Sequence, residues 1–391
     1  MSSALGYGSV GIVLLCLSAC SSSSSGNAAG SGGAGGVGGK PTNAGGTGDS
    51  AAKGGQGGAG GQAGGHGGSS AAGSGASGGS GGSGSAAHSC FAKPLFSAQM
   101  PWNQRVDTAK KDPRSETIIS ALQRRGWGAG RLQIDFSIDV LCAPKGTALR
   151  EFEQTEDFYA DDCDNEAVPV PSGGHVEGES GYRCEGDGDC HLIVIAQDTN
   201  KLYEQWRVDI DQSTYRGGCL AVWQLDRAYD ATLRGDQCSS ADAAGLPIAP
   251  LLFDADEVKR GAIEHAVRFA IPNTHIHMST YVRPATHATD AASAGEDGVP
   301  YGGRLRLRAD YPLNDLPNEG ARVLARALQR YGMILADGGN IALMGQDDRG
   351  TEAKWDGLLA PRDLDKIKPS DFELVDAGER FTWNGDCVLE H

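Results

Sequence analysis

Basic residues are scarce in this sequence. Its 391 residues include 34 Lys and Arg against 50 Asp and Glu, which gives a formal net charge of −16 at pH 7. Nucleic acids and anionic membranes are bound through positively charged surface. We therefore expect neither of them to be a main partner, so that any contact with a membrane depends on a lipid anchor. We also expect a monomer.

Several motifs of common active sites are missing as well. Outside the Gly/Ser-rich segment near the N-terminus, the chain has no G-x-S-x-G nucleophile motif and no C-x2-C pair. It also lacks a Gly-rich phosphate loop between a strand and a helix. These absences argue against a serine hydrolase, a structural zinc site and a nucleotide-binding site. The sequence predicts no cofactor.

The first 20 residues form a short apolar segment. Its run from Val10 to Leu17 is too short for a membrane span, which needs about 20 apolar residues, and suits the apolar region of an export signal. The end of the segment, Leu17-Ser18-Ala19-Cys20, resembles the lipobox of bacterial lipoproteins, although a basic residue before the apolar run is missing. The resemblance implies that Cys20 is lipidated and, with Ser21 after it, that the protein is exported to the outer membrane or cell surface.

Residues 21–88 consist almost entirely of Gly, Ser and Ala. Such a segment cannot bury enough apolar surface to offset the entropy lost on ordering. Glycine does not recur at every third position, which excludes a collagen helix. We expect a disordered tether over residues 21–88 and a single globular extracytoplasmic domain over residues 89–391.

Eight of the ten cysteines remain in the mature domain once Cys16 and the lipidated Cys20 are set aside. An even number of cysteines in an exported domain predicts a disulfide framework. The spacings alone do not determine the connectivity. The pairings that we expect are Cys184–Cys190, Cys219–Cys238, Cys142–Cys163 and Cys90–Cys387.

Strand patterns outnumber helix patterns in residues 89–391. The segment 132–140 alternates between apolar and polar residues, and the apolar runs 191–196, 201–208 and 219–225 predict antiparallel neighbours. The segments MILAD and NIALMG, on either side of a Gly-Gly pair, predict a hairpin. Helices are expected at 115–126, near Asp254 and at 318–331. We predict a mainly β fold with a few helices (α+β), namely an antiparallel β-sandwich or open barrel stapled by disulfides.

The segments SADAAGLPIAPLLFDADEVKRGAIEHAVRF, YVRPATH and RYGMILADGGN resemble stretches of uncharacterised secreted domains of soil bacteria. The resemblance covers about the last two-thirds of the domain. It implies one exported module and carries no catalytic residues with it.

Two groups of residues could be considered for metal binding. His275 and His277 share one face of a possible strand but have no third ligand at short spacing, and they suit an exposed loop better. The acidic loop with Glu185, Asp187 and Asp189 lacks the spacing of an EF-hand. The sequence therefore predicts no metal site.

Polar residues between positions 242 and 287 form the candidate active site. Asp242 lies among small residues, where a carboxyl could be desolvated enough to act as an acid, although it could equally cap a turn. Two carboxylates can act as acid and base on a glycosidic bond. The predicted catalytic residues are Asp242, Glu264 and His287, and the predicted substrate-binding residues are His265, Arg268, Tyr281 and Arg283.

These observations favour a surface-tethered enzyme that hydrolyses an extracellular polysaccharide by carboxylate acid/base chemistry. One alternative is a non-catalytic surface lipoprotein that binds carbohydrate or protein in the same groove. A third possibility is a polysaccharide lyase, in which Arg268 or Arg283 would neutralise a uronic acid. Whether the domain releases sugar from polysaccharides discriminates between them.

Overall fold

The computed structural model describes residues 91–390, apart from residues 129, 156–158, 187 and 341–342. These residues belong to one compact unit. The predicted signal peptide, its lipidation site Cys20, the tether and Cys90 lie outside the described residues. None of the helices that the structure describes is long and apolar enough to cross a membrane.

The fold is mainly β, as predicted, with three α-helices among the described residues. The helices are α1 (Ser115–Arg125), α2 (Ala255–Arg260) and α3 (Glu319–Arg330). Short 3-10 turns lie at Pro101–Asn103, Ala160–Asp162, Ala249–Leu251, Asn273–His275, Leu313–Asp315 and Pro369–Asp371.

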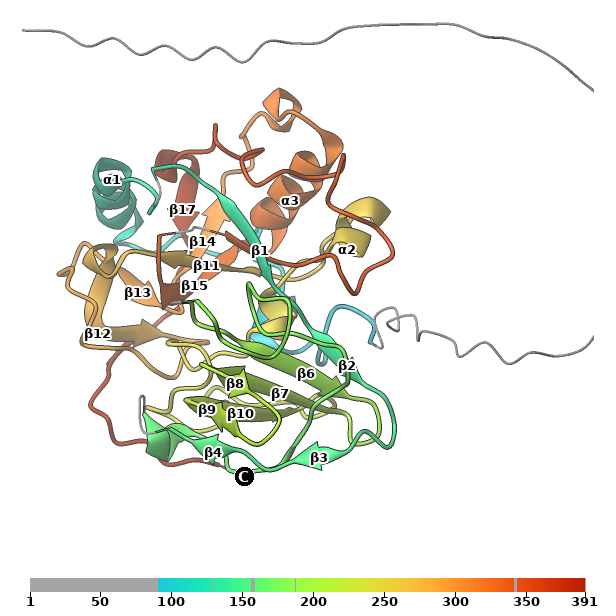
Figure 1. The fold of residues 1–391 in the computed structure, drawn as a ribbon. Helices are drawn as coiled ribbons and strands as arrows, with labels where there is room; N and C mark the ends of the chain where they lie inside the picture. The colour runs from blue at the N-terminus through green and yellow to red at the C-terminus, as the bar shows by residue number, and fades with distance from the viewer. Residues whose placement is uncertain (1–90, 129, 156–158, 187, 341–342, 391) are drawn as a thin grey trace, which may run out of the picture. The chain divides into compact units, whose positions relative to one another are not determined.

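The largest sheet has six strands, and it lies in the upper part of Figure 1. Helix α1 packs against its last strand and α3 against the strand next to that one. The strand order is β1 (Ile134–Ile138), β16 (Leu343–Gln346), β11 (Val267–Ile271), β15 (Met333–Gly338), β14 (Arg304–Leu307) and β17 (Phe372–Leu374).

Two pairs of neighbouring strands in this sheet are parallel. β1 runs parallel to β16, and β11 runs parallel to β15. Because β16 and β11 are antiparallel to each other, the carboxyl ends of the two pairs lie at opposite edges of the sheet. The sheet is therefore mixed rather than antiparallel. The predicted hairpin of MILAD and NIALMG is wrong, because β11 lies between β15 and β16.

A second sheet has four strands and lies below the first in Figure 1. Its order is β10 (Cys219–Gln224), β7 (Lys201–Trp206), β6 (Leu192–Ala196) and β2 (Leu141–Ala143). β6, β7 and β10 are antiparallel neighbours, as predicted. Ile193, Leu202 and Trp223 face the core shared with the six-stranded sheet. Leu192, Val194 and Leu220 face a smaller core.

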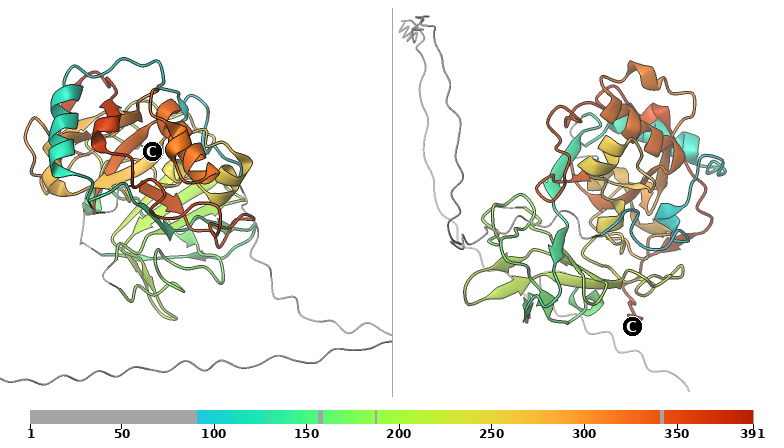
Figure 2. Two further views of the ribbon diagram at one scale, coloured as in Figure 1. Left: turned by 90° about the horizontal axis from the view of Figure 1, so that it is seen from above. Right: turned by 90° about the vertical axis from the view of Figure 1, so that its right-hand side faces the viewer.

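Three smaller sheets complete the described fold. Figure 2 shows the whole ribbon from two further sides. Within the residues described, no sheet is closed into a barrel, and the two larger sheets share a core as in a sandwich. The small sheets contain β13 (Val299–Tyr301), β12 (Ile276–Val282) and β18 (Arg380–Thr382); β3 (Leu149–Arg150) and β5 (Val168–Pro169); and β4 (Glu153–Gln154), β9 (Tyr215–Gly217) and β8 (Asp209–Ile210).

Helix α3 shows how the sequence specifies its ends. Asn318 caps it by accepting a hydrogen bond from the backbone N–H of Ala321, at 2.8 Å. Gly332 follows with φ of +72°, and a Cβ there would lie 2.7 Å from the carbonyl oxygen of Leu305. Only glycine suits this position, where the chain turns from α3 into β15 beside β14.

Disulfides connect distant parts of the domain. Of the expected pairings, Cys184–Cys190 is confirmed. The other three are wrong, because Cys163 pairs with Cys219 and Cys238 pairs with Cys387. Cys142 is also disulfide-bonded. Neighbours in sequence are a poor guide here, since the fold places Cys163 next to the start of β10 and Cys387 next to Cys238.

Candidate active site

Arg268 on β11 lies at the centre of a buried ionic cluster. Its Nε is 2.8 Å from Asp242 Oδ2, and its Nη2 is 2.9 Å from Asp337 Oδ2. The Asp242 side chain is 0% exposed, whereas that of Asp337 is 28% exposed. A planar guanidinium holds two carboxylates in fixed directions. Arg268 therefore orients Asp337, which is the accessible carboxyl of the two.

Asp242 also keeps the local role that the sequence left open. Its Oδ1 accepts a hydrogen bond from the backbone N–H of Ala244 at 3.3 Å, which closes a turn. Burial raises the pKa of Asp242, and Arg268 opposes that rise. Asp242 is thus a turn-closing residue and an ion-pair partner at once.

A second buried ion pair lies near Arg268. Glu177 Oε2 is 2.6 Å from His191 Nδ1, and His191 Nε2 lies 3.2 Å from the carbonyl oxygen of Ala241. Burial opposes ionisation of Glu177, but His191 outweighs it and lowers the pKa of Glu177 to about 2. Burial also disfavours the imidazolium, but Glu177 outweighs it and raises the pKa of His191 to about 9. The pair is ionised at neutral pH.

A cavity of about 190 Å³ lies next to this cluster. It opens at the carboxyl end of β11 and β15, the edge of a parallel pair where ligands commonly bind. Asp337 and Asp189 both line it. Trp206 donates from its Nε1 to Asp189 Oδ1 at 3.1 Å. The lining residues are Asp189, Trp206, Ala241, Ala243, Asn273, Thr289, Ala291, Tyr301, Asp337 and Gly338.

Asp337 is the residue of this cavity that can hold a proton near neutral pH. Desolvation raises its pKa to about 7 against the attraction of Arg268, and the negative charges of Asp242 and Asp189 add to the rise. Two carboxylates share one guanidinium here, so only one of them can be ionised at little cost. A carboxyl that titrates near pH 7 and a second acid therefore meet at one accessible cavity.

Two of the predicted site residues lie away from this cavity. Glu264 is exposed and precedes β11, next to Tyr331, whereas the cavity lies beyond the opposite end of that strand. His265 is buried with its Nε2 3.3 Å from Glu257 Oε2, at the start of α2. The structure does not bring Glu264 and His265 together with Asp242. Arg268 pairs with Asp242 and Asp337 because β11 is buried on both faces.

Tyr281 and Arg283 form a separate group. The Tyr281 hydroxyl donates to Asp236 Oδ1 at 2.9 Å, and Arg283 Nη1 lies 2.9 Å from the same oxygen. Tyr281 stacks on Phe381, with ring centroids 5.3 Å apart. Both polar groups are thereby used within the fold, so the structure does not place them in the cavity with Asp337.

His287 is buried close to Asp242 but does not contact it. Its Nδ1 is 2.7 Å from the carbonyl oxygen of Ala243. The rings of Tyr159 and Trp383 lie 4.7 and 5.0 Å from its own, centroid to centroid. Burial lowers the pKa of His287 to about 4. The imidazole is neutral at physiological pH and is enclosed by aromatic rings.

The sequence prediction missed most of the acids and the histidine that surround Arg268. Asp337 was visible as a lone carboxylate at the end of an apolar strand, and His191 as an imidazole at the start of another. Neither pattern is specific. Glu177 lies in a loop and carried no signal.

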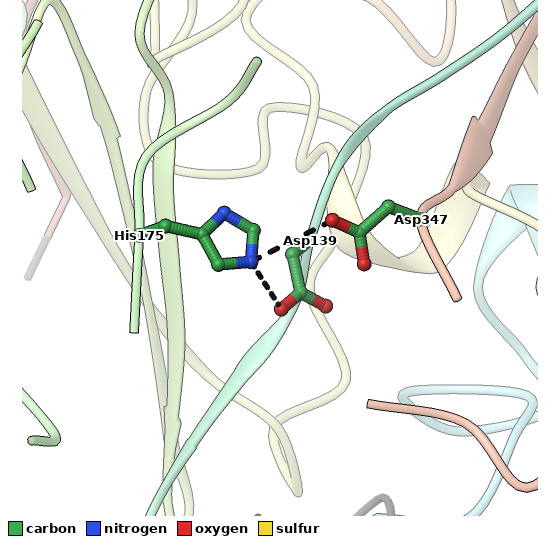
Figure 3. Close-up of side chains that lie close together, drawn as sticks. All are labelled: Asp139, His175 and Asp347. Carbon is green, nitrogen blue, oxygen red and sulfur yellow. Dashed lines mark ion pairs between the residues drawn. The ribbon is translucent and has the colours of Figure 1, made fainter. Parts of the chain in front are cut away.

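One further set of side chains could hold a metal ion. Asp139, His175 and Asp347 are all buried, and one ligand atom of each lies within 4.8 Å of the others. Figure 3 shows the imidazole directed at both carboxylates.

Comparison of the chain with known protein families, with curated proteins and with solved structures finds no match. The function has therefore to be inferred from the geometry of the chain's own residues.

Proposed function

We propose that the protein is a surface-tethered enzyme that hydrolyses an extracellular polysaccharide, with Asp337 and Asp189 as its carboxylate pair. The observation that carries this proposal is their position: a carboxyl that holds a proton near pH 7 and a second carboxylate line one cavity, beside a tryptophan. This constellation replaces the site expected from the sequence. It keeps Asp242 and Arg268 as positioning residues.

The chemistry follows from the two environments. Asp337, kept neutral by burial, donates its proton to the leaving oxygen of a glycosidic bond. Asp189 is exposed and hydrogen-bonded to Trp206, which suits a carboxylate that activates water or attacks the sugar. The indole of Trp206 offers an apolar surface against which a sugar ring can pack.

The positioning residues explain why the acid is in place before substrate arrives. Arg268 fixes one oxygen of Asp337, and the backbone N–H of Gly338 donates to the other at 2.7 Å. The ion pair with Asp242 in turn holds Arg268. An acid held in this way loses little entropy when it transfers its proton.

The predicted lipid anchor and tether support a polymeric substrate outside the cell. The predicted tether would let the domain reach along a polymer that cannot itself enter the cell. Localisation at the outer membrane or cell surface remains a part of this proposal.

The test is release of reducing ends from a panel of bacterial and plant polysaccharides by the purified full-length chain. We expect Asp337→Asn and Asp189→Asn to lower kcat by about 10²- to 10⁴-fold, the usual contribution of a general acid or base. Substrate affinity should change little. The wild-type kcat should fall as the pH rises through about 7, because Asp337 then loses its proton. Asp356→Asn, which changes an exposed acid elsewhere, is the control.

Two results would contradict the proposal. Binding of a polysaccharide without any release of reducing ends would indicate a carbohydrate-binding module. Products that absorb in the ultraviolet would indicate elimination by a lyase.

A further inference from the structure

Asp139 and Asp347 meet at the carboxyl end of the other parallel strand pair. Asp139 directly follows β1 and Asp347 directly follows β16, and Ile138 lies opposite Gln346 after a register shift in the strand pair. The backbone N–H of Asp347 donates to the carbonyl oxygen of Ile138 at 2.7 Å. Two adjacent parallel strands thus bring their following carboxylates side by side, and a loop brings His175 to them.

Each of the three side chains has one polar atom satisfied by the protein. Asp139 Oδ1 accepts from the backbone N–H of Val140 at 2.8 Å and from Gln346 Nε2 at 3.2 Å. Asp347 Oδ1 accepts from the backbone N–H of Arg349 at 2.9 Å. His175 Nδ1 lies 3.2 Å from the carbonyl oxygen of Val176, to which it can only donate. In the neutral imidazole, the lone pair is therefore on Nε2.

The remaining three atoms converge. His175 Nε2 is 3.2 Å from Asp139 Oδ2 and 3.6 Å from Asp347 Oδ2, as the dashed lines in Figure 3 show. Among the described residues, His175 Nε2 and Asp347 Oδ2 are buried and have no hydrogen-bond partner. Leaving such groups without a hydrogen bond in the protein interior is costly.

We propose that Asp139, His175 and Asp347 bind a divalent first-row transition-metal ion. Ligand atoms about 2.1 Å from a common ion, at tetrahedral or octahedral angles, lie about 3.0–3.4 Å apart. The two distances to His175 Nε2 are close to this range. One imidazole with two carboxylates suits ions such as Mn²⁺, Co²⁺ and Zn²⁺ better than Mg²⁺ or Ca²⁺, which prefer oxygen ligands only.

The charges of the ligands also support the assignment of a divalent metal ion. Two carboxylates compensate a divalent cation, and a ligating histidine that donates its other N–H to a backbone carbonyl is the usual arrangement around a metal. A cation of the protein lies only at the edge of the cluster. Arg349 Nε is 3.2 Å from Asp347 Oδ2 without hydrogen-bond geometry, and its side chain is 49% exposed.

The site has room for further ligands. Asp139, His175 and Gln346 line a cavity of about 640 Å³. The Oε1 of Gln346 is also buried without a hydrogen-bond partner among the described residues. Two of the three proposed ligands, Asp139 and His175, lie at the wall of this cavity, which leaves coordination positions for water or for an oxygen ligand. The proposal is independent of the polysaccharide site, which lies at the opposite edge of the sheet.

The test is calorimetric titration of the EDTA-treated, dialysed full-length chain with Mn²⁺, Co²⁺ and Zn²⁺, with visible absorption of the Co²⁺ complex as a second readout. We expect one ion per chain. His175→Ala and the isosteric Asp347→Asn should each weaken binding by at least about 100-fold, and Gln346→Leu, which removes a hydrogen bond to a ligand, by about 10- to 100-fold. His277→Gln, a histidine outside the cluster, is the control and should bind as the wild type does.

Arg349→Gln tests the assignment from the other direction. It removes a positive charge next to the proposed ion, so binding should become tighter, whereas a purely structural ion network would gain nothing. The proposal is overturned if the wild-type chain binds none of the three ions at millimolar concentration. It is also overturned if folded Asp347→Asn, checked by circular dichroism, binds them as tightly as the wild type.

Discussion

Each of the two parallel strand pairs of the six-stranded sheet lies next to two carboxylates, but the group between the carboxylates differs. At the carboxyl end of β11 and β15, Asp337 and Asp242 converge on Arg268. At the carboxyl end of β1 and β16, at the opposite edge, Asp139 and Asp347 converge on the imidazole of His175. One group contains a cation of the chain itself. The other contains the imidazole of His175, which can act as a metal ligand through Nε2.

This difference separates two ways of keeping acids inside a protein. Buried carboxylates need a counter-charge or a proton. Arg268 supplies the charge for Asp242 and leaves Asp337 to hold a proton, which is what an acid catalyst needs. Where the chain supplies an imidazole, the counter-charge is either the second proton of that ring or, as we propose for His175, a bound metal ion. Two pairs of buried or half-buried carboxylates next to the same sheet thus support different chemistry.

The largest expected effect comes from removing the chain's own cation. Arg268→Met should lower the free energy of unfolding by about 3–5 kcal/mol, because Asp242 then stays buried without a partner. The measurement is urea denaturation at pH 7 followed by fluorescence and circular dichroism.

The double variant Arg268→Met with Asp242→Leu provides the control. It removes both charges, and we expect it to recover most of the lost stability. If the single variant is as stable as the wild type, Arg268 is not the counter-charge of this cluster.

The two clusters can be compared by neutralising one acid in each of them. Asp242→Asn should cost about 2 kcal/mol, as for a lost hydrogen bond to a charged group, whether or not metal is present. In EDTA, Asp347→Asn should leave the free energy of unfolding unchanged or raise it by up to about 1 kcal/mol, because it relieves the repulsion with Asp139. With saturating Zn²⁺, Asp347→Asn should instead be the less stable chain, since it loses the stabilisation that binding provides.

Thermal unfolding of Asp242→Asn and of Asp347→Asn, each compared with the wild type with and without Zn²⁺, gives the four changes in stability. A loss for Asp347→Asn of the same size in both conditions would mean that the two clusters do not differ in the way proposed.

Much of the fold could be predicted from local patterns. Helix α3 followed from Asn318, its apolar stripe and Gly332. The antiparallel order of β6, β7 and β10 followed from short apolar runs with turns between them. The hairpin of β15 and β16 failed because adjacency along the chain does not reveal a strand inserted between two others. Period-two patterns show two faces of a strand but not whether both are covered, so they did not indicate that Arg268 on β11 is buried.

The sites were less accessible to sequence reasoning. Asp242 and Arg268 were assigned to one site, and a 2.8 Å ion pair joins them, although their roles remain proposals. The proposed ligands Asp139, His175 and Asp347 come from three segments far apart in the chain, so no spacing motif predicts them. Their convergence depends on the register of two parallel strands, which only the fold determines.

The smallest expected effect concerns a second buried histidine. His287 resembles His175: Nδ1 faces a backbone carbonyl, and Nε2 is buried with no hydrogen-bond partner among the described residues. Aromatic rings surround His287, however, and burial lowers its pKa to about 4.

Because the unfolded chain takes up this proton near pH 6.5 and the folded chain only near pH 4, His287 should cost stability as the pH falls between these values. The loss should be about 1 kcal/mol between pH 6.5 and 5.5. Urea denaturation at several pH values should show this slope in the wild type and a reduced slope in His287→Asn, whose amide can still donate to Ala243. Equal slopes would mean that His287 takes up its proton at the same pH in the folded chain as in the unfolded chain. The aromatic surroundings would then not keep it neutral, and the contrast with His175 would lose its basis.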